Sequence, residues 1–151
     1  MQRSRPWTDP ESGSASLEFV TAGLILLLPM VYLVLTMSAV QAGALAVEGA
    51  SRHAARVFVQ APDSAQAAAR AERAVEVALA DYGIDGATAT VAITCRPEPS
   101  DCLTRRGFVT VAVTTAVPLP LVPQVLDLDL ALQVPLSSTA TQQVSRFWGA
   151  G

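Results

Sequence analysis

Hydrophobic and charged positions are distributed very unevenly along this chain of 151 residues. No charged residue occurs from Phe19 to Val47, and residues 19–40 form the most apolar part. A helix rises about 1.5 Å per residue, so this part would be about 33 Å long, enough to cross a bilayer core of about 30 Å. The pattern therefore predicts a membrane-spanning helix near the N-terminus, and Pro29 is expected to kink it.

The helical pattern continues past the apolar part and ends before Pro62, which predicts one long helix over residues 14–60. Glu48 and Arg52 are spaced for a helical ion pair. The residues expected near one apolar face are Val40, Ala44, Val47, Ala54 and Phe58. Alanines recur every fourth residue at 42, 46, 50 and 54, either as a ridge that lets another helix approach closely or as a coincidence in an alanine-rich chain.

A second, shorter helix is predicted after residue 62. Asp63 is suited to its N-cap, Gln66 completes a box-like cap, and Gly83 is suited to the C′ position. The stripe expected to be buried consists of Ala68, Ala71, Val75, Ala78 and Tyr82. These mostly small side chains favour close packing against the first helix.

The last part of the chain alternates apolar and polar residues, which is typical of half-buried strands. The alternation occurs at residues 87–94 and 108–117, and again at 126–134 and 136–144, where we expect one bent strand or two strands divided at Pro135. The expected fold class is α+β, with a long N-terminal transmembrane helix plus a second helix packed on a small antiparallel β-sheet. Early arginines resist translocation, so we expect residues 1–13 to form a cytoplasmic leader and residues 61–151 an extracytoplasmic α+β domain.

Composition argues against several classes of function. The chain has no Lys, one His and a net charge of −3, and no stretch of its sequence gathers more than two arginines. We therefore expect no nucleic-acid partner. Motifs for phosphate binding, serine hydrolysis and zinc binding are missing, so we expect no enzyme activity, no catalytic residues, no metal site and no cofactor. His53, Asp127 and Asp129 are better explained as solvated polar positions.

The two cysteines, Cys95 and Cys102, lie seven residues apart between the first two predicted strands. A disulfide is expected if this part of the chain lies outside the cytoplasm, and the alternative is a pair of free thiols. Closing so short a loop would stabilise the fold by about 2–3 kcal/mol.

Glu18 most needs an explanation, because a carboxylate at the edge of an apolar helix is costly unless it is paired or reaches the membrane interface. The helix dipole would favour a negative charge in the first turn. That explanation does not account for Gly13, which stands five residues before the glutamate.

The residues Gly13, Ser14, Glu18 and Phe19, in the order Gly-Ser-Ala-Ser-Leu-Glu-Phe ahead of an apolar helix, resemble the cleavage site of type IV prepilins. The resemblance implies that a prepilin peptidase cuts after Gly13, so that Ser14 becomes the N-terminus and Glu18 the fifth residue. In that family the glutamate neutralises the new amine of a neighbouring subunit inside an apolar core. Residues 50–56 and the Thr- and Val-rich strands are similar to TadE-like pseudopilins, the minor pilins of Tad (Flp) systems, although many relatives place the proline nearer to the glutamate.

The resemblance implies a structural minor pilin, inserted in the bacterial cytoplasmic membrane with its N-terminus inside and extracellular after pilus assembly. Its expected partners are the prepilin peptidase, other Tad pilus subunits, the membrane assembly platform and the lipid bilayer. Two alternatives remain. One is a cleaved secretory signal, for which residues 42–46 offer small-residue sites, and the other is a permanent single-pass anchor of an extracytoplasmic binding domain.

Overall fold

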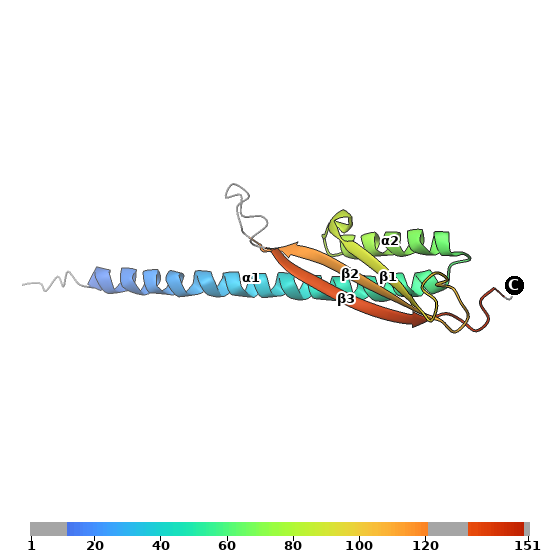
Figure 1. Cartoon of the computed structure of the whole chain (residues 1–151). Helices are drawn as coiled ribbons and strands as arrows, with labels where there is room; N and C mark the ends of the chain where they lie inside the picture. Colours follow the sequence, from blue (N-terminus) through green and yellow to red (C-terminus); the bar gives the residue numbers. More distant parts are fainter. Residues whose placement is uncertain (1–11, 121–132, 150–151) are drawn as a thin grey trace, which may run out of the picture. The chain divides into compact units, whose positions relative to one another are not determined.

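The computed structural model describes residues 12–120 and 133–149. The chain divides into two compact units, residues 1–37 and 38–151, which we describe separately. The first helix, α1 (Ser12–Val59), contributes its first part to one unit and its remainder to the other (Figure 1). The other described elements all belong to the second unit.

In the first unit, α1 is an apolar helix with exposed side chains, and it stays helical through Pro29. The hydroxyl groups of its two threonines bond to the helix itself. Thr21 Oγ1 donates to the Leu17 carbonyl at 2.8 Å, and Thr36 Oγ1 donates to the Leu33 carbonyl at 2.9 Å. These bonds satisfy the hydroxyl groups without water, which suits an apolar environment.

In the second unit, α1 presents a row of small side chains to the core. Ala46, Ala50 and Ala54 have exposed fractions of 1 %, 0 % and 0 %. The four-residue alanine spacing is therefore a packing surface and not a coincidence. Ala44 is exposed, so its predicted place on the buried face is wrong, whereas the polar Ser51 is fully buried.

The second helix, α2 (Ser64–Ala80), begins as the sequence predicts. Asp63 is its N-cap: one carboxylate oxygen accepts from the backbone N–H of Gln66 at 2.8 Å, and the other accepts from the Gln66 side-chain amide at 2.7 Å. The buried stripe differs from the predicted one and consists of Ala67, Ala71, Ala74, Val75 and Leu79. Tyr82, predicted to be buried, is 50 % exposed because the helix ends before it.

The end of α2 has the predicted glycine in a left-handed conformation. Gly83 has a φ of +71°. Its backbone N–H donates to the Ala80 carbonyl at 2.9 Å, and the next N–H, from Ile84, donates to the Leu79 carbonyl at 3.1 Å. These two bonds define a Schellman ending with Gly83 at the C′ position.

Three strands form one antiparallel sheet in chain order. They are β1 (Thr90–Arg96), β2 (Phe108–Pro118) and β3 (Gln133–Gln143). On β2, Val109, Val111 and Val113 are fully buried, whereas Thr114 on the opposite face is exposed. The buried face shares one hydrophobic core with α1 and α2, so the predicted α+β class is confirmed (Figure 1).

The strand predicted from residue 87 begins later, because a 3-10 turn, η1 (Gly86–Thr88), precedes it. The side chain of Asp85 accepts from the Ala87 backbone N–H at 2.9 Å and fixes this turn. Gly86 lies so close to α2 that a β-carbon there would come 2.7 Å from the Cα atom of Glu76. Only glycine allows this approach.

Strand β3 runs through Pro135 without interruption, so of the two predicted alternatives the division into two strands at that proline is wrong. β3 is an edge strand, and Pro135 lies opposite Ala116 of β2. An edge strand accommodates proline because no partner needs its N–H on the open side. The rest of the predicted alternating segment, residues 126–132, lies outside the described residues.

Candidate functional site

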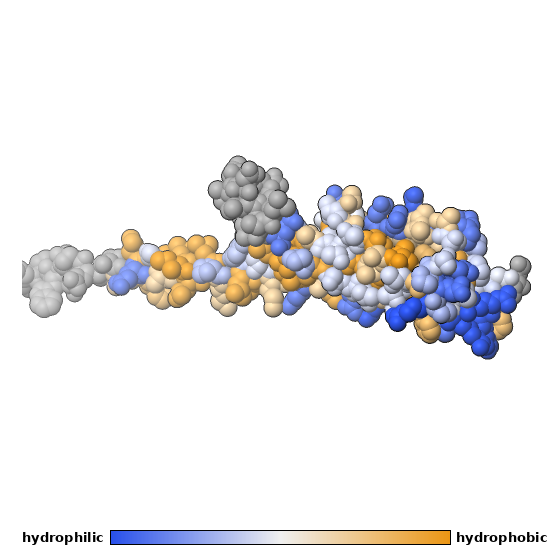
Figure 2. Space-filling view, viewed as in Figure 1, coloured by the Kyte–Doolittle hydropathy of each residue, from blue (hydrophilic) through white to orange (hydrophobic). Residues whose placement is uncertain are grey.

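The first part of α1 carries the most unusual surface of the described chain. Phe19 is 79 % exposed and Leu26 is 72 % exposed, and the other large apolar side chains from Val20 to Met37 are exposed as well. Among the described helices, only α1 is long and apolar enough to cross a membrane. This part of the helix is largely orange in Figure 2. Such a surface requires a bilayer or other apolar helices to cover it.

The residues of the predicted processing site all lie in α1, which begins at Ser12. They are Gly13, Ser14, Glu18 and Phe19. Glu18 is exposed, and the first turn of α1 contains no acidic residue.

Glu18 also lacks a counter-charge along the described helix. The next charged residue after it in the sequence is Glu48, which belongs to the second unit. Within the described residues, the one ion pair joins Arg52 to Glu48. A carboxylate in an apolar surface is stabilised by an opposite charge or by reaching the membrane interface, and no described residue supplies the opposite charge to Glu18.

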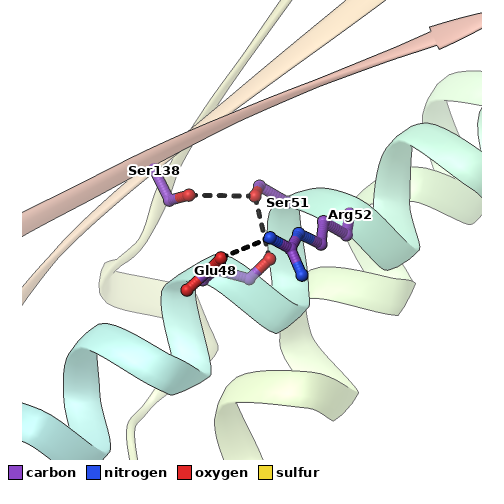
Figure 3. A network of polar contacts seen from close by, with 4 residues as sticks. All are labelled: Glu48, Ser51, Arg52 and Ser138. Atoms are coloured by element: carbon purple, nitrogen blue, oxygen red, sulfur yellow. Dashed lines mark hydrogen bonds and ion pairs between the residues drawn. The ribbon is translucent and has the colours of Figure 1, made fainter.

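A small polar contact joins α1 to β3 (Figure 3). The buried hydroxyl of Ser51 lies 3.0 Å from the Glu48 carbonyl oxygen and 3.2 Å from the Ser138 hydroxyl. Beside it, Arg52 pairs with the Glu48 carboxylate at the predicted i,i+4 spacing. The exposed ion pair contributes only about 0.2–0.5 kcal/mol, whereas the buried hydroxyl needs its partners to offset desolvation. The contact between Ser51 and Ser138 therefore helps α1 to pack against β3.

The structure joins Cys95, near the end of β1, to Cys102 by a disulfide with a Cα–Cα distance of 5.1 Å. Cys95 is 5 % exposed, and Leu103, the residue after Cys102, is 1 % exposed, so the closed loop is fixed to the core. Disulfides persist in oxidising compartments, which indicates that the second unit is extracytoplasmic.

The described residues contain no cluster of three or more His, Cys, Asp or Glu side chains that could hold a metal ion. His53 is exposed on α1. Asp127 and Asp129 lie outside the described residues.

The fold gathers four arginines that are far apart in the sequence. Arg96 ends β1, Arg105 and Arg106 precede β2, and Arg146 follows β3; all four are exposed. We call this end of the sheet the arginine end. The sequence did not predict it, because no stretch gathers more than two arginines. Only the register, which places Arg96 opposite Phe108 and Phe108 opposite Gln143, brings them to the same end.

A scan against models of protein families, a search of curated proteins and a search of solved structures each found no match. The structure itself has a pilin-like architecture, in which a small antiparallel sheet follows a long apolar N-terminal helix. The apolar helix indicates a membrane anchor or signal segment, and the disulfide indicates an extracytoplasmic domain.

Proposed function

We propose that this protein is a minor pilin or pseudopilin of a Tad-type pilus, with a structural role. Glu18 carries the proposal, because it is a carboxylate in the exposed apolar surface of α1, five residues after Gly13 and without a counter-charge along the described helix. The pilin-like architecture supports the same assignment. The disulfide supports it as well, because disulfides are typical of extracytoplasmic domains.

Cleavage after Gly13 supplies the missing charge. The new α-amine of Ser14 is positively charged at neutral pH. An unpaired ion in an apolar environment costs several kcal/mol, so an amine and a carboxylate that meet there stabilise each other strongly. Pairing the Ser14 amine of one subunit with Glu18 of its neighbour would satisfy both groups and fix how far one helix is shifted along the next.

The exposed apolar surface of α1 then has two successive partners. Before assembly, the lipid bilayer covers it, with the N-terminus in the cytoplasm. After assembly, the apolar helices of other Tad pilus subunits cover it, and the protein becomes extracellular. The prepilin peptidase and the membrane assembly platform are the partners that act between these two states.

N-terminal sequencing of the protein recovered from membranes and from sheared filaments tests the proposal. A start at Ser14 is the expected result. A start at Leu45 or Val47 would show a cleaved secretory signal, and an intact Met1 would show a permanent single-pass anchor of an extracytoplasmic binding domain. Either of these results would overturn the pilin assignment.

A further inference from the structure

The second unit has an open groove between α1 and the free edge of β3. Arg52 and Arg56 of α1 are exposed, and both line this groove together with Thr141 of β3. The groove continues past Arg56 and Gln142 to Gln60. Because β3 is the last strand of the described sheet on this side, no described strand covers the groove.

The charge of this groove is positive. Arg52 pairs with the Glu48 carboxylate, which is the one ion pair among the described residues. Arg56 therefore has no acidic partner in the described part of the chain. His53 also lines the groove and brings no negative charge. The groove consequently favours a partner with negative charge.

The side of the second unit beside β1 has the opposite charge. Glu72 and Glu76 of α2 are exposed, and neither forms an ion pair within the described residues. At about 100° per residue they lie about 40° apart around the helix axis, whereas Arg73 lies about 60° beyond Glu76, and Arg70 lies further round. The backbone of Glu76 lies against η1, which leads into β1, the other edge strand. We call Glu72 and Glu76 the acidic face of α2.

The two charged surfaces have the same spacing and compatible directions. Arg52 and Arg56 are four residues apart, as are Glu72 and Glu76, so each pair lies on one side of its helix with about 6 Å between the residues. In one copy, α2 runs in the direction opposite to α1 (Figure 1). Copies anchored in one membrane share an orientation, so α1 of one copy is antiparallel to α2 of the next. Arg56 is then paired with Glu72 when Arg52 is paired with Glu76.

The groove and the acidic face also lie at similar heights along the second unit. A short turn joins α1 to α2 at one end, and Ala42 and Gly83 line a common pocket toward the other. Glu72 is therefore level with about residues 51–54 of its own α1, and Arg56 lies only slightly further along. Neighbours that stand side by side can thus bring the two surfaces together.

The shift that this contact requires between neighbouring copies is small. Moving one copy by about 3–8 Å along the helix brings its Glu72 level with Arg56 of the other. The pairing of the Ser14 amine with Glu18 of a neighbour requires a shift of about 6 Å, because these residues are four positions apart. The two shifts are of the same size. A contact between different faces of identical chains, repeated without closing into a ring, produces a filament.

We propose that the groove beside β3 of one copy of this chain binds the acidic face of α2 of a second copy. Arg56 faces Glu72 in this contact, and Arg52 faces Glu76. The contact rests on the proposed function and deepens it, because it names the surfaces through which the extracytoplasmic units of neighbouring subunits meet.

Cysteine crosslinking of the full-length chain in its native membrane tests this contact. One tagged copy carries Gln60→Cys, a differently tagged copy carries Ala69→Cys, and both native cysteines are kept. The two positions are exposed and lie one turn from Arg56 and Glu72, respectively. Mild oxidation with copper phenanthroline should link the two chains through these cysteines, as identified by mass spectrometry. Thr114→Cys, exposed on the outer face of the sheet, replaces Ala69→Cys in the matched control and should give about tenfold less dimer.

Charge reversal sharpens the test. Arg56→Glu in the Gln60→Cys chain should lower the dimer yield about tenfold, because it places a carboxylate opposite Glu72. Glu72→Arg in the Ala69→Cys chain should lower the yield equally, and the two reversals together should restore it. Arg146→Glu makes the same change of charge at the arginine end and should leave the yield unchanged.

Several results would overturn the contact. They are the absence of the linked dimer, an equal yield from the Thr114→Cys control, and losses that the combined reversal does not restore. The N-terminus of the same sample is sequenced in parallel. A start at Ser14 without the dimer would refute only the contact between α1 and α2, whereas the dimer with a different N-terminus would refute only the pilin assignment.

Discussion

The two parts of α1 meet the same physical requirement in opposite ways. In the first unit the helix carries large apolar side chains that are exposed, such as Leu26 at 72 %. In the second unit it carries small ones that are buried, such as Ala54 at 0 %. The second part is covered by the chain's own sheet and α2, whereas the first part has to be covered by other molecules. One continuous helix thus combines a part that packs in the core of its own chain with a part whose apolar surface is left for other molecules to cover.

The largest effect is expected near the start of α1. Gly13→Ala should abolish processing, because a β-carbon would crowd the peptidase site. Gly23→Ala is the control: it adds the same methyl group to α1, ten residues after Gly13, where nothing lies within 4 Å of the new atom. Gel mobility and N-terminal sequencing of membrane-bound protein measure both variants. Normal cleavage of the Gly13 variant would remove the basis for the assigned cleavage site.

Loss of the disulfide should affect the stability of the second unit only. Replacing Cys95 and Cys102 by serine should lower the free energy of unfolding of the second unit by about 2–3 kcal/mol. Processing at Ser14 should be unchanged. Urea unfolding in detergent, followed by the fluorescence of Trp148 in a Trp7→Phe background, measures the loss. Dithiothreitol should destabilise the parent chain by a similar amount and leave the serine variant unchanged, and an effect on both would contradict this account.

Overpacking distinguishes the two parts of α1 directly. Ala54→Leu adds volume to a completely buried position and should destabilise the second unit by about 1–3 kcal/mol. Leu26→Ala removes more apolar surface, but from the exposed part, and should change the same unfolding transition by less than about 0.5 kcal/mol. Equal effects in the urea experiment would show that the two parts do not differ as described.

The smallest effect is expected at the start of α2. Asp63→Ala removes the acceptor for the Gln66 N–H and should cost about 1 kcal/mol, whereas Asp63→Asn keeps an acceptor and should cost much less. The urea midpoint measures the difference. If the alanine and asparagine variants unfolded alike, the carboxylate would not be stabilising the helix as a cap.

Local patterns in the sequence predicted most of the fold. The valines of β2 alternate with period two, and the structure buries that face. Asp63 caps the start of α2 with its carboxylate, and Gly83 ends the helix in a left-handed conformation. Periodicity did not predict which face of an alanine-rich helix is buried, so the pattern places Ala44 in the core although it is exposed. Alanine occurs on every face of such a helix and gives little contrast between faces.

Only part of the candidate site could be predicted from local patterns in the sequence. Gly13 and Glu18 form a local motif that can be read from the sequence, whereas the arginine end depends on strand register. Arg96 and Arg146 are distant in the sequence and come to the same end of the sheet only through their pairing partners in β2 and β3. The 3-10 turn before β1 likewise depends on a tertiary contact, the close approach of Gly86 to α2.

The most direct test of the central claim measures whether the charge of Glu18 is required for assembly. Glu18→Gln keeps the shape of the side chain and removes its charge. The account predicts that this variant is cut to begin at Ser14, like the parent chain, and remains in the membrane without entering sheared filaments. Incorporation of the cleaved Glu18→Gln chain into filaments at the parent level would contradict the account.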